Sequence, residues 1–178
     1  IIPINGEITL ESNSGLFSTS QVASANDFVD SLKKAQDDSS VKGIIVEINS
    51  PGGGVVASEQ MAKALKKFSK PKVALIREVG ASGAYWAATS ADYIIADPLS
   101  ITGSIGVIGS YLDFSGLMQK YGINYDQLIS GKYKDTGSPY KKLTDDEHKL
   151  LQSKIELIHN YFINEVAKNR NMPISQAN

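Results

Sequence analysis

The feature that most restricts the fold of this chain is an alternation of aliphatic segments with segments of helical periodicity. Residues 41–49, VKGIIVEIN, form a nearly continuous aliphatic run, which is typical of a strand covered on both faces in a parallel sheet. A second run, KPKVALIREV at 70–79, leads into the small-residue segment GASGAYWAATS at 80–90. Apolar residues before the first run are spaced by three and four, at Val22, Ala25, Val29 and Leu32. This order predicts an α/β fold with a mainly parallel sheet and right-handed helical crossovers.

One strand and one long helix are predicted in the second half of the chain. INYDQLISG at 123–131 has the pattern of another strand. A long helix is expected after Thr144, because Thr144 and Glu147 have the spacing of a capping box and apolar residues follow on one stripe.

The composition is that of an ordinary globular domain. The 178 residues are 42% hydrophobic and carry a formal net charge of −1, so we expect a single domain over 1–178. A near-neutral chain lacks the positive charge that a nucleic-acid partner requires. The absence of cysteine excludes disulfides, thiolate catalysis and zinc–thiolate sites.

Two glycine-rich loops follow successive predicted strands, SPGGG at 50–54 and GASGA at 80–84. Ligands and catalytic groups gather at the carboxyl ends of parallel strands, and glycine leaves backbone N–H groups unshielded, as an oxyanion hole requires. Each loop alone could be a simple strand-to-helix turn. Two such loops at neighbouring strand ends favour a binding or catalytic site there.

Ser82 stands between two glycines at the start of a predicted helix, where it could be either a helix cap or a nucleophile. In the second case the amide of Gly83 would be free to point at an oxyanion. The hydrolase pattern G-x-S-x-G is not met, because Ala84 occupies the final glycine position. An α/β-hydrolase is therefore disfavoured.

The sequence disfavours a histidine as the base for such a serine. His148 and His159 both lie in the last long helix, and a surface role for the first and a structural role for the second explain them. Lysine can replace histidine if its pKa falls from about 10.4 to about 7–8. Lys132 and Lys134, in a glycine-bounded loop near Tyr133 and Tyr140, are the candidates, and spacing alone does not separate them.

Four motifs taken in order resemble the signal peptide peptidase A family, serine peptidases on the ClpP/crotonase fold. They are INSPGGG at 48–54, GASGAYWAATSADYIIADP at 80–98, TGSIGV at 102–107 and GKYKDTGSP at 131–139. The likeness covers most of the chain and includes the half-length members of the family. It implies repeated β-β-α units with a mainly parallel sheet and flanking helices, within one peptidase domain.

The resemblance also implies roles for individual residues. Ser82 matches the family nucleophile, and Lys134 matches the general base, whereas Lys132 falls outside the matching position. Ser104 matches a hydroxyl that orients the base lysine. The reaction implied is peptide hydrolysis by a Ser/Lys dyad, with no cofactor and no metal.

The oxyanion hole implied by the family is formed by the amides of Gly53 and Gly83. The loop here has one more glycine than the commonest form of the motif, so the first of these amides could instead be that of Gly54.

The partners and the location are likewise expectations drawn from the resemblance. The lysine comes from a neighbouring subunit in half-length members, so a homo-oligomer is implied, with eight subunits in a ring. Its substrates would be unfolded peptides, including remnant signal peptides. We expect a single-pass location in the cell membrane, with the catalytic domain on the extracytoplasmic side. The anchor would precede IIPINGEITL at 1–10, and a short further segment would follow residue 178.

Three other readings are weaker. A crotonase-like acyl-CoA enzyme uses the same scaffold and a similar amide pair, but it needs no serine at the helix start. A non-catalytic assembly module would not need Ser82, Ser104 and Lys134 together. A phosphate-binding loop is disfavoured, because SPGGGVV lacks the lysine and hydroxyl of a P-loop.

Overall fold

The computed structural model describes residues 1–12 and 22–177, and the chain divides into two compact units. The first, called here the sheet unit, consists of Ile1–Gly106 with His159–Asn178; the second, the loop unit, is Val107–Ile158. The expectation of one peptidase domain over 1–178 stays a prediction.

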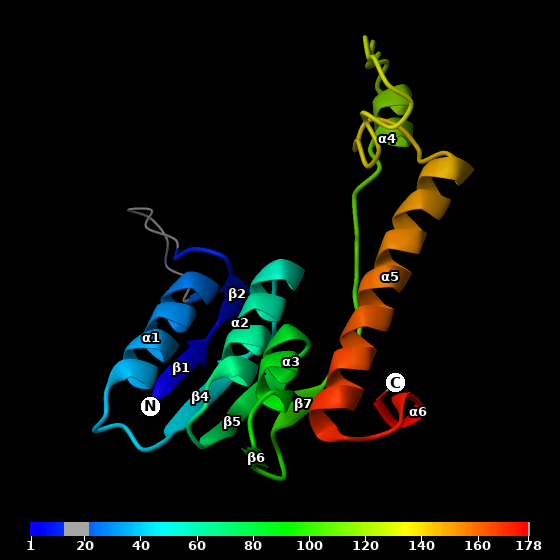
Figure 1. Ribbon diagram of the computed structural model, residues 1–178. Helices are drawn as coiled ribbons and strands as arrows, with labels where there is room; N and C mark the ends of the chain where they lie inside the picture. Colours follow the sequence, from blue (N-terminus) through cyan, green and yellow to red (C-terminus); the bar gives the residue numbers. More distant parts are fainter. Residues whose placement is uncertain (13–21, 178) are drawn as a thin grey trace. The chain divides into compact units, whose positions relative to one another are not determined.

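The sheet unit is built on a parallel sheet whose strands run in the order β1-β4-β5-β6, with β7 paired to the end of β5 (Figure 1). Its strands are β1 (Ile2–Asn5), β4 (Ile44–Ser50), β5 (Lys72–Ala81), β6 (Tyr93–Ala96) and β7 (Ile101–Gly103). A second parallel pair is formed by β2 (Glu7–Thr9) and β3 (Val22–Ser24). The predicted α/β fold with a mainly parallel sheet is confirmed.

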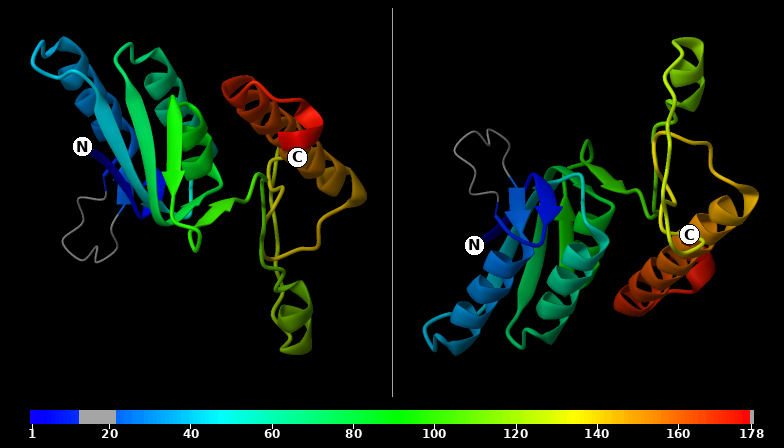
Figure 2. Two further views of the ribbon diagram at one scale, coloured as in Figure 1. Left: turned by 90° about the horizontal axis from the view of Figure 1, so that it is seen from below. Right: turned by 90° about the horizontal axis from the view of Figure 1, so that it is seen from above.

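Three helices pack side by side, with α2 between the other two (Figure 1, Figure 2). They are α1 (Ala25–Asp37), α2 (Val55–Lys67) and α3 (Gly83–Thr89). The core between them and the sheet includes Ile4, Val46, Ile48, Met61 and Leu65, all fully buried. Burial of such side chains stabilises the fold by about 1.5–3 kcal/mol each.

The strand β4 differs from its prediction in one respect. Its residues alternate between buried and accessible, and Ile45 is 40% exposed. The helices therefore cover one face of this strand, not both. The period of two was already present in Glu47 and Asn49, but Ile45 gave the segment the look of a continuous aliphatic run.

The remaining helices are α4 (Ser115–Lys120), α5 (Asp145–Arg170) and α6 (Ile174–Ala177). The predicted long helix is confirmed, and in the sheet unit its end packs on α3, where Phe162 stacks on Trp86 with ring centroids 4.7 Å apart. The strand predicted at 123–131 is wrong: this segment has no regular secondary structure. Within 107–158 it pairs with no other strand, and an isolated strand has nothing to satisfy its backbone groups.

The expected single-pass location in the cell membrane needs correction. In the part of the chain that the structure describes, no helix has both the length and the apolar character needed to cross a bilayer. The longest helix, α5, has three acidic residues in its first turn and basic residues in its last. That location is not supported.

Candidate active site

Ser82 lies at a sharp turn between β5 and α3. Its φ of 52° and ψ of −125° are far from the conformations that non-glycine residues favour, and such strain costs on the order of 1–3 kcal/mol. The turn is held by two backbone hydrogen bonds, from Ser82 N to Gly103 O at 2.8 Å and from Trp86 N to Ser82 O at 2.9 Å. The Ser82 side chain makes no capping hydrogen bond, so helix capping does not explain the serine.

The glycine loop after β4 lies directly against this turn. Gly52 has a φ of 98°, and a Cβ on it would lie 2.8 Å from both Gly83 N and Ser82 Cβ. Only a residue without a side chain allows this approach, because both neighbouring atoms belong to a fixed turn. The two loops that the sequence placed at neighbouring strand ends are therefore in contact.

Two backbone amides are placed where they could serve an oxyanion. Gly83 is the first residue of α3, so its N–H has no partner within the helix. Gly54 N donates to Ile8 O at 2.9 Å, whereas Gly53 N donates to no backbone carbonyl among the described residues. Gly53 N also lies only 3.7 Å from where a Cβ on Gly83 would stand. This geometry favours Gly53 over Gly54, and the role itself stays a prediction.

Ser58 is a site residue that the sequence did not reveal. Its side chain is buried, its Oγ donates to Gly54 O at 2.9 Å, and a Cβ on Gly83 would lie only 2.0 Å from that Oγ. Ser58 therefore fills the space between the two glycine loops. The available signal was a hydroxyl on the buried stripe of α2, at helical spacing from Met61 and Leu65.

The two remaining predicted residues lie in different units. Ser104 belongs to the sheet unit, is exposed, has a φ of 53° and follows Gly103, whose carbonyl holds the Ser82 turn. Lys134 belongs to the loop unit, where its side chain is exposed. The pairing of Lys134 with Ser82 stays a prediction.

Lys132, the other candidate base, is engaged elsewhere. Its Nζ lies 2.8 Å from Asp146 Oδ2, and the hydrogen bond to this carboxylate raises the pKa of Lys132 above its ordinary value. Both side chains of this pair are more than half exposed, so the contact is a surface ion pair of little strength. The choice of Lys134 over Lys132 rests on the family motif and stays a prediction.

Comparison with known proteins identifies the family. The sequence model of a family described as "Peptidase family S49" matches residues 64–178, which include the Ser82 turn and the loop of Lys134. The chain belongs to peptidase family S49. The S49 chain is 40% identical over 174 residues to a signal peptide peptidase SppA of Enterococcus faecium, and 37% identical over 148 residues to Protease 4 of Haemophilus influenzae. These matches confirm the resemblance to the signal peptide peptidase A family and assign the chain to a family of serine peptidases.

The two matches cover different shares of this chain and of its relatives. The first covers 96% of the S49 chain and 50% of the relative, and the second covers 82% and 24%. The chain therefore spans about half the length of one relative and a quarter of the other. Among solved structures, a ClpP1 variant of Listeria monocytogenes is similar with a TM-score of 0.60 at 14% identity, over 99% of this chain and 75% of that one. This likeness confirms the ClpP-like fold.

The glycine loop offers a test with a matched control. A Cβ on Gly53 would lie 2.2 Å from Ile8 O and 2.6 Å from Ile8 N, whereas the nearest atom to a Cβ on Gly54 is 3.6 Å away. Gly53→Ala must displace backbone, so we expect kcat/KM for an unstructured peptide to fall about 10²–10³-fold. The kcat/KM of Gly54→Ala should stay within about threefold of that of the original chain. Equal activity of the two variants, measured beside their Tm values, would contradict this arrangement.

Proposed function

We propose that this S49 chain is a serine endopeptidase in which Ser82 is the nucleophile and Lys134 is the general base. The observation that carries the proposal is the strained backbone of Ser82, whose hydroxyl makes no capping hydrogen bond and whose turn lies against the glycine loop 50–54. Strain of this kind persists where function requires it and the surrounding structure maintains it. The spacing of Lys134 within GKYKDTGSP and the family membership add support.

The proposed reaction follows from these positions. The neutral amine of Lys134 accepts the proton of Ser82 Oγ as this oxygen attacks the scissile carbonyl carbon. The N–H groups of Gly53 and Gly83 donate to the oxyanion that forms. The C–N bond breaks as the lysine returns the proton to the leaving amine, and water then hydrolyses the acyl-enzyme with the same lysine as base. Ser104 would donate to or accept from the lysine amine and keep it aimed at Ser82.

A homo-oligomer is part of the proposal because of the surface of the loop unit. Within 107–158 the only buried residue is Glu147, while large apolar side chains are exposed. The most exposed are Ile108 at 89%, Leu128 at 97%, Tyr121 at 69% and Leu112 at 68%. A surface of this kind marks an interaction site. We infer that a second copy of the chain covers it, in a ring of eight where Lys134 of one subunit serves Ser82 of the next.

The substrate class proposed is unfolded peptide, including signal peptides left after their cleavage from proteins. A ring admits an extended chain more readily than a folded protein. An extended peptide can add backbone hydrogen bonds along a strand edge next to the site. The name of the Enterococcus faecium relative, a signal peptide peptidase, supports this substrate class.

The proposal is tested by native mass spectrometry together with cleavage of two substrates, an unstructured peptide with an apolar signal-like segment and a compact folded protein. We expect an assembled form that cleaves the first and spares the second. Leu128→Glu should reduce both assembly and cleavage, because it places a charge where an apolar contact is proposed. Ser130→Glu, at an exposed polar position nearby, is the charge control. Full activity in a monomeric fraction would overturn the shared site.

A further inference from the structure

Glu147 is the only buried charged residue in the described part of the chain, with 2% of its surface exposed. Part of its environment is a capping box at the start of α5. Thr144 N donates to Glu147 Oε2 at 2.9 Å, and Glu147 N donates to Thr144 Oγ1 at 3.3 Å. This function occupies only one of the two carboxylate oxygens, so capping does not explain the whole site.

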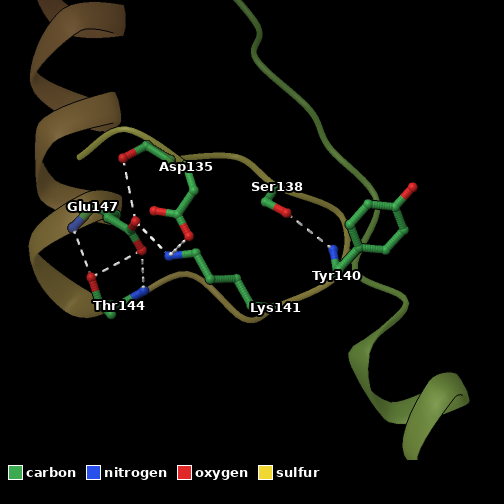
Figure 3. Close-up of polar contacts among 7 residues, drawn as sticks. Asp135, Ser138, Tyr140, Lys141, Thr144 and Glu147 are labelled. Atoms are coloured by element: carbon green, nitrogen blue, oxygen red, sulfur yellow. Dashed lines mark hydrogen bonds and ion pairs between the residues drawn. The ribbon is translucent and has the colours of Figure 1, made fainter. Parts of the chain in front are cut away.

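The second oxygen faces the loop that carries Lys134. Glu147 Oε1 accepts from Lys141 Nζ at 2.7 Å and from Thr136 Oγ1 at 3.3 Å. Lys141 Nζ contacts two carboxylates, since Asp135 Oδ2 is also 3.2 Å away (Figure 3). Asp135 and Thr136 directly follow Lys134 in the sequence. The two residues after Lys134 are therefore tied to the first turn of α5.

The chain before Lys134 is tied to the same helical turn by a weaker contact. Lys132 pairs with Asp146, but both side chains are more than half exposed. Exposed pairs of this kind contribute little to stability. By contrast, the Asp135 and Glu147 side chains are only 9% and 3% exposed. The buried cluster is thus the stronger of the two attachments.

The members of the cluster are charged at neutral pH. The hydrogen bond from Lys141, together with the amide of Thr144, lowers the pKa of Glu147 to about 2. The hydrogen bond to Glu147 in turn raises the pKa of Lys141. Removing one partner of a buried pair leaves the other charge uncompensated. Because the loop unit has no buried apolar side chain, this polar cluster holds the loop in place of an apolar core.

We propose that Glu147, acting through Lys141, is a positioning residue that fixes the loop 131–141 so that the amine of Lys134 is presented in one orientation. The inference rests on the proposed Ser82–Lys134 dyad. Glu147 does not touch the reacting atoms. A displacement of about 1 Å at a catalytic group can lower the rate about 100-fold, so an effect of this size is expected without loss of the fold.

Glu147→Gln separates positioning from capping. Glutamine serves equally in a capping box, so the start of α5 is retained, whereas the ion pair with Lys141 is lost. We expect kcat for an unstructured peptide to fall about 10–100-fold with KM within about twofold. Asp146→Asn is the matched control, because it breaks the exposed Lys132 pair one residue away. The kcat of Asp146→Asn should stay within about twofold of that of the original chain.

A second measurement links the effect to Lys134. In a Lys134→Ala background, Glu147→Gln should cause no further loss in the rate at which a fluorophosphonate labels the nucleophile, since a group that acts through the lysine has nothing left to position. An equal loss in both backgrounds would mean a structural role and would overturn the inference. Lys141→Met, which removes the other side of the pair, is measured in parallel in case Glu147→Gln does not fold.

The outcomes for the two proposals are distinct. If Lys134→Ala is inactive and Glu147→Gln keeps full kcat, the positioning role is wrong and the dyad stands. If Lys134→Ala keeps full activity, the dyad itself is wrong.

Discussion

Ser82→Ala is expected to abolish peptide cleavage while leaving the fold and the assembly intact. The hydroxyl makes no capping hydrogen bond, and the backbone hydrogen bonds of the turn do not involve the side chain. Its loss should therefore cost little stability. Removal of a serine nucleophile lowers kcat on the order of 10⁶-fold in a well-studied serine protease, so a loss of roughly 10⁵-fold or more is expected here. The measurements are kcat for an unstructured peptide, Tm and native mass.

The control for this variant is Ser39→Ala, at an exposed turn residue of the sheet unit. It should match the original chain in all three measurements. Cleavage by Ser82→Ala at more than about a thousandth of the original rate, after repurification, would exclude Ser82 as the nucleophile.

Lys134→Ala is expected to be nearly inactive by itself and to regain activity when mixed with Ser82→Ala. Loss of a general base costs about 10²–10⁴-fold. If the site is shared between neighbours, the first variant contributes intact serines and the second contributes intact lysines. Random mixing at equal amounts then gives both groups to about a quarter of the sites.

The mixing experiment requires subunit exchange, which native mass spectrometry of differently labelled protomers can establish. The control is a mixture of Ser82→Ala with the Ser82→Ala/Lys134→Ala double variant, which supplies no intact serine. If exchange occurs and activity stays absent in the first mixture, the site lies within one chain and the shared arrangement is wrong.

The sheet unit could be predicted from sequence because burial in its core leaves a periodic pattern of apolar residues within single segments. Alternate residues of β4 and the apolar stripe of α1 are buried in the same core, although Val22, the first residue of the helical spacing, lies in β3. The segment 123–131 has an equally plausible strand pattern but forms no strand. Strand formation requires a partner, and a pattern within one segment does not show whether a partner exists.

The candidate site was predictable to a similar degree. Ser82 and its neighbouring glycines are residue types that are typical of tight turns, and Ser82 and Gly52 do have a positive φ. Ser58 was missed because its contact is with Gly83, 25 positions along the chain. Spacing alone also did not show that Lys132 pairs with Asp146 in the next helix. Long-range pairings of this kind depend on the folded arrangement and leave no periodic signal.

The most direct test of the proposed Ser82–Lys134 dyad is to label the assembled protein with a fluorophosphonate and map the modified residue by mass spectrometry. We expect a single modified residue, Ser82, and labelling that slows about 10²–10⁴-fold in Lys134→Ala. Modification of another serine, or an unlabelled Ser82 in a preparation that still cleaves peptides, would contradict it.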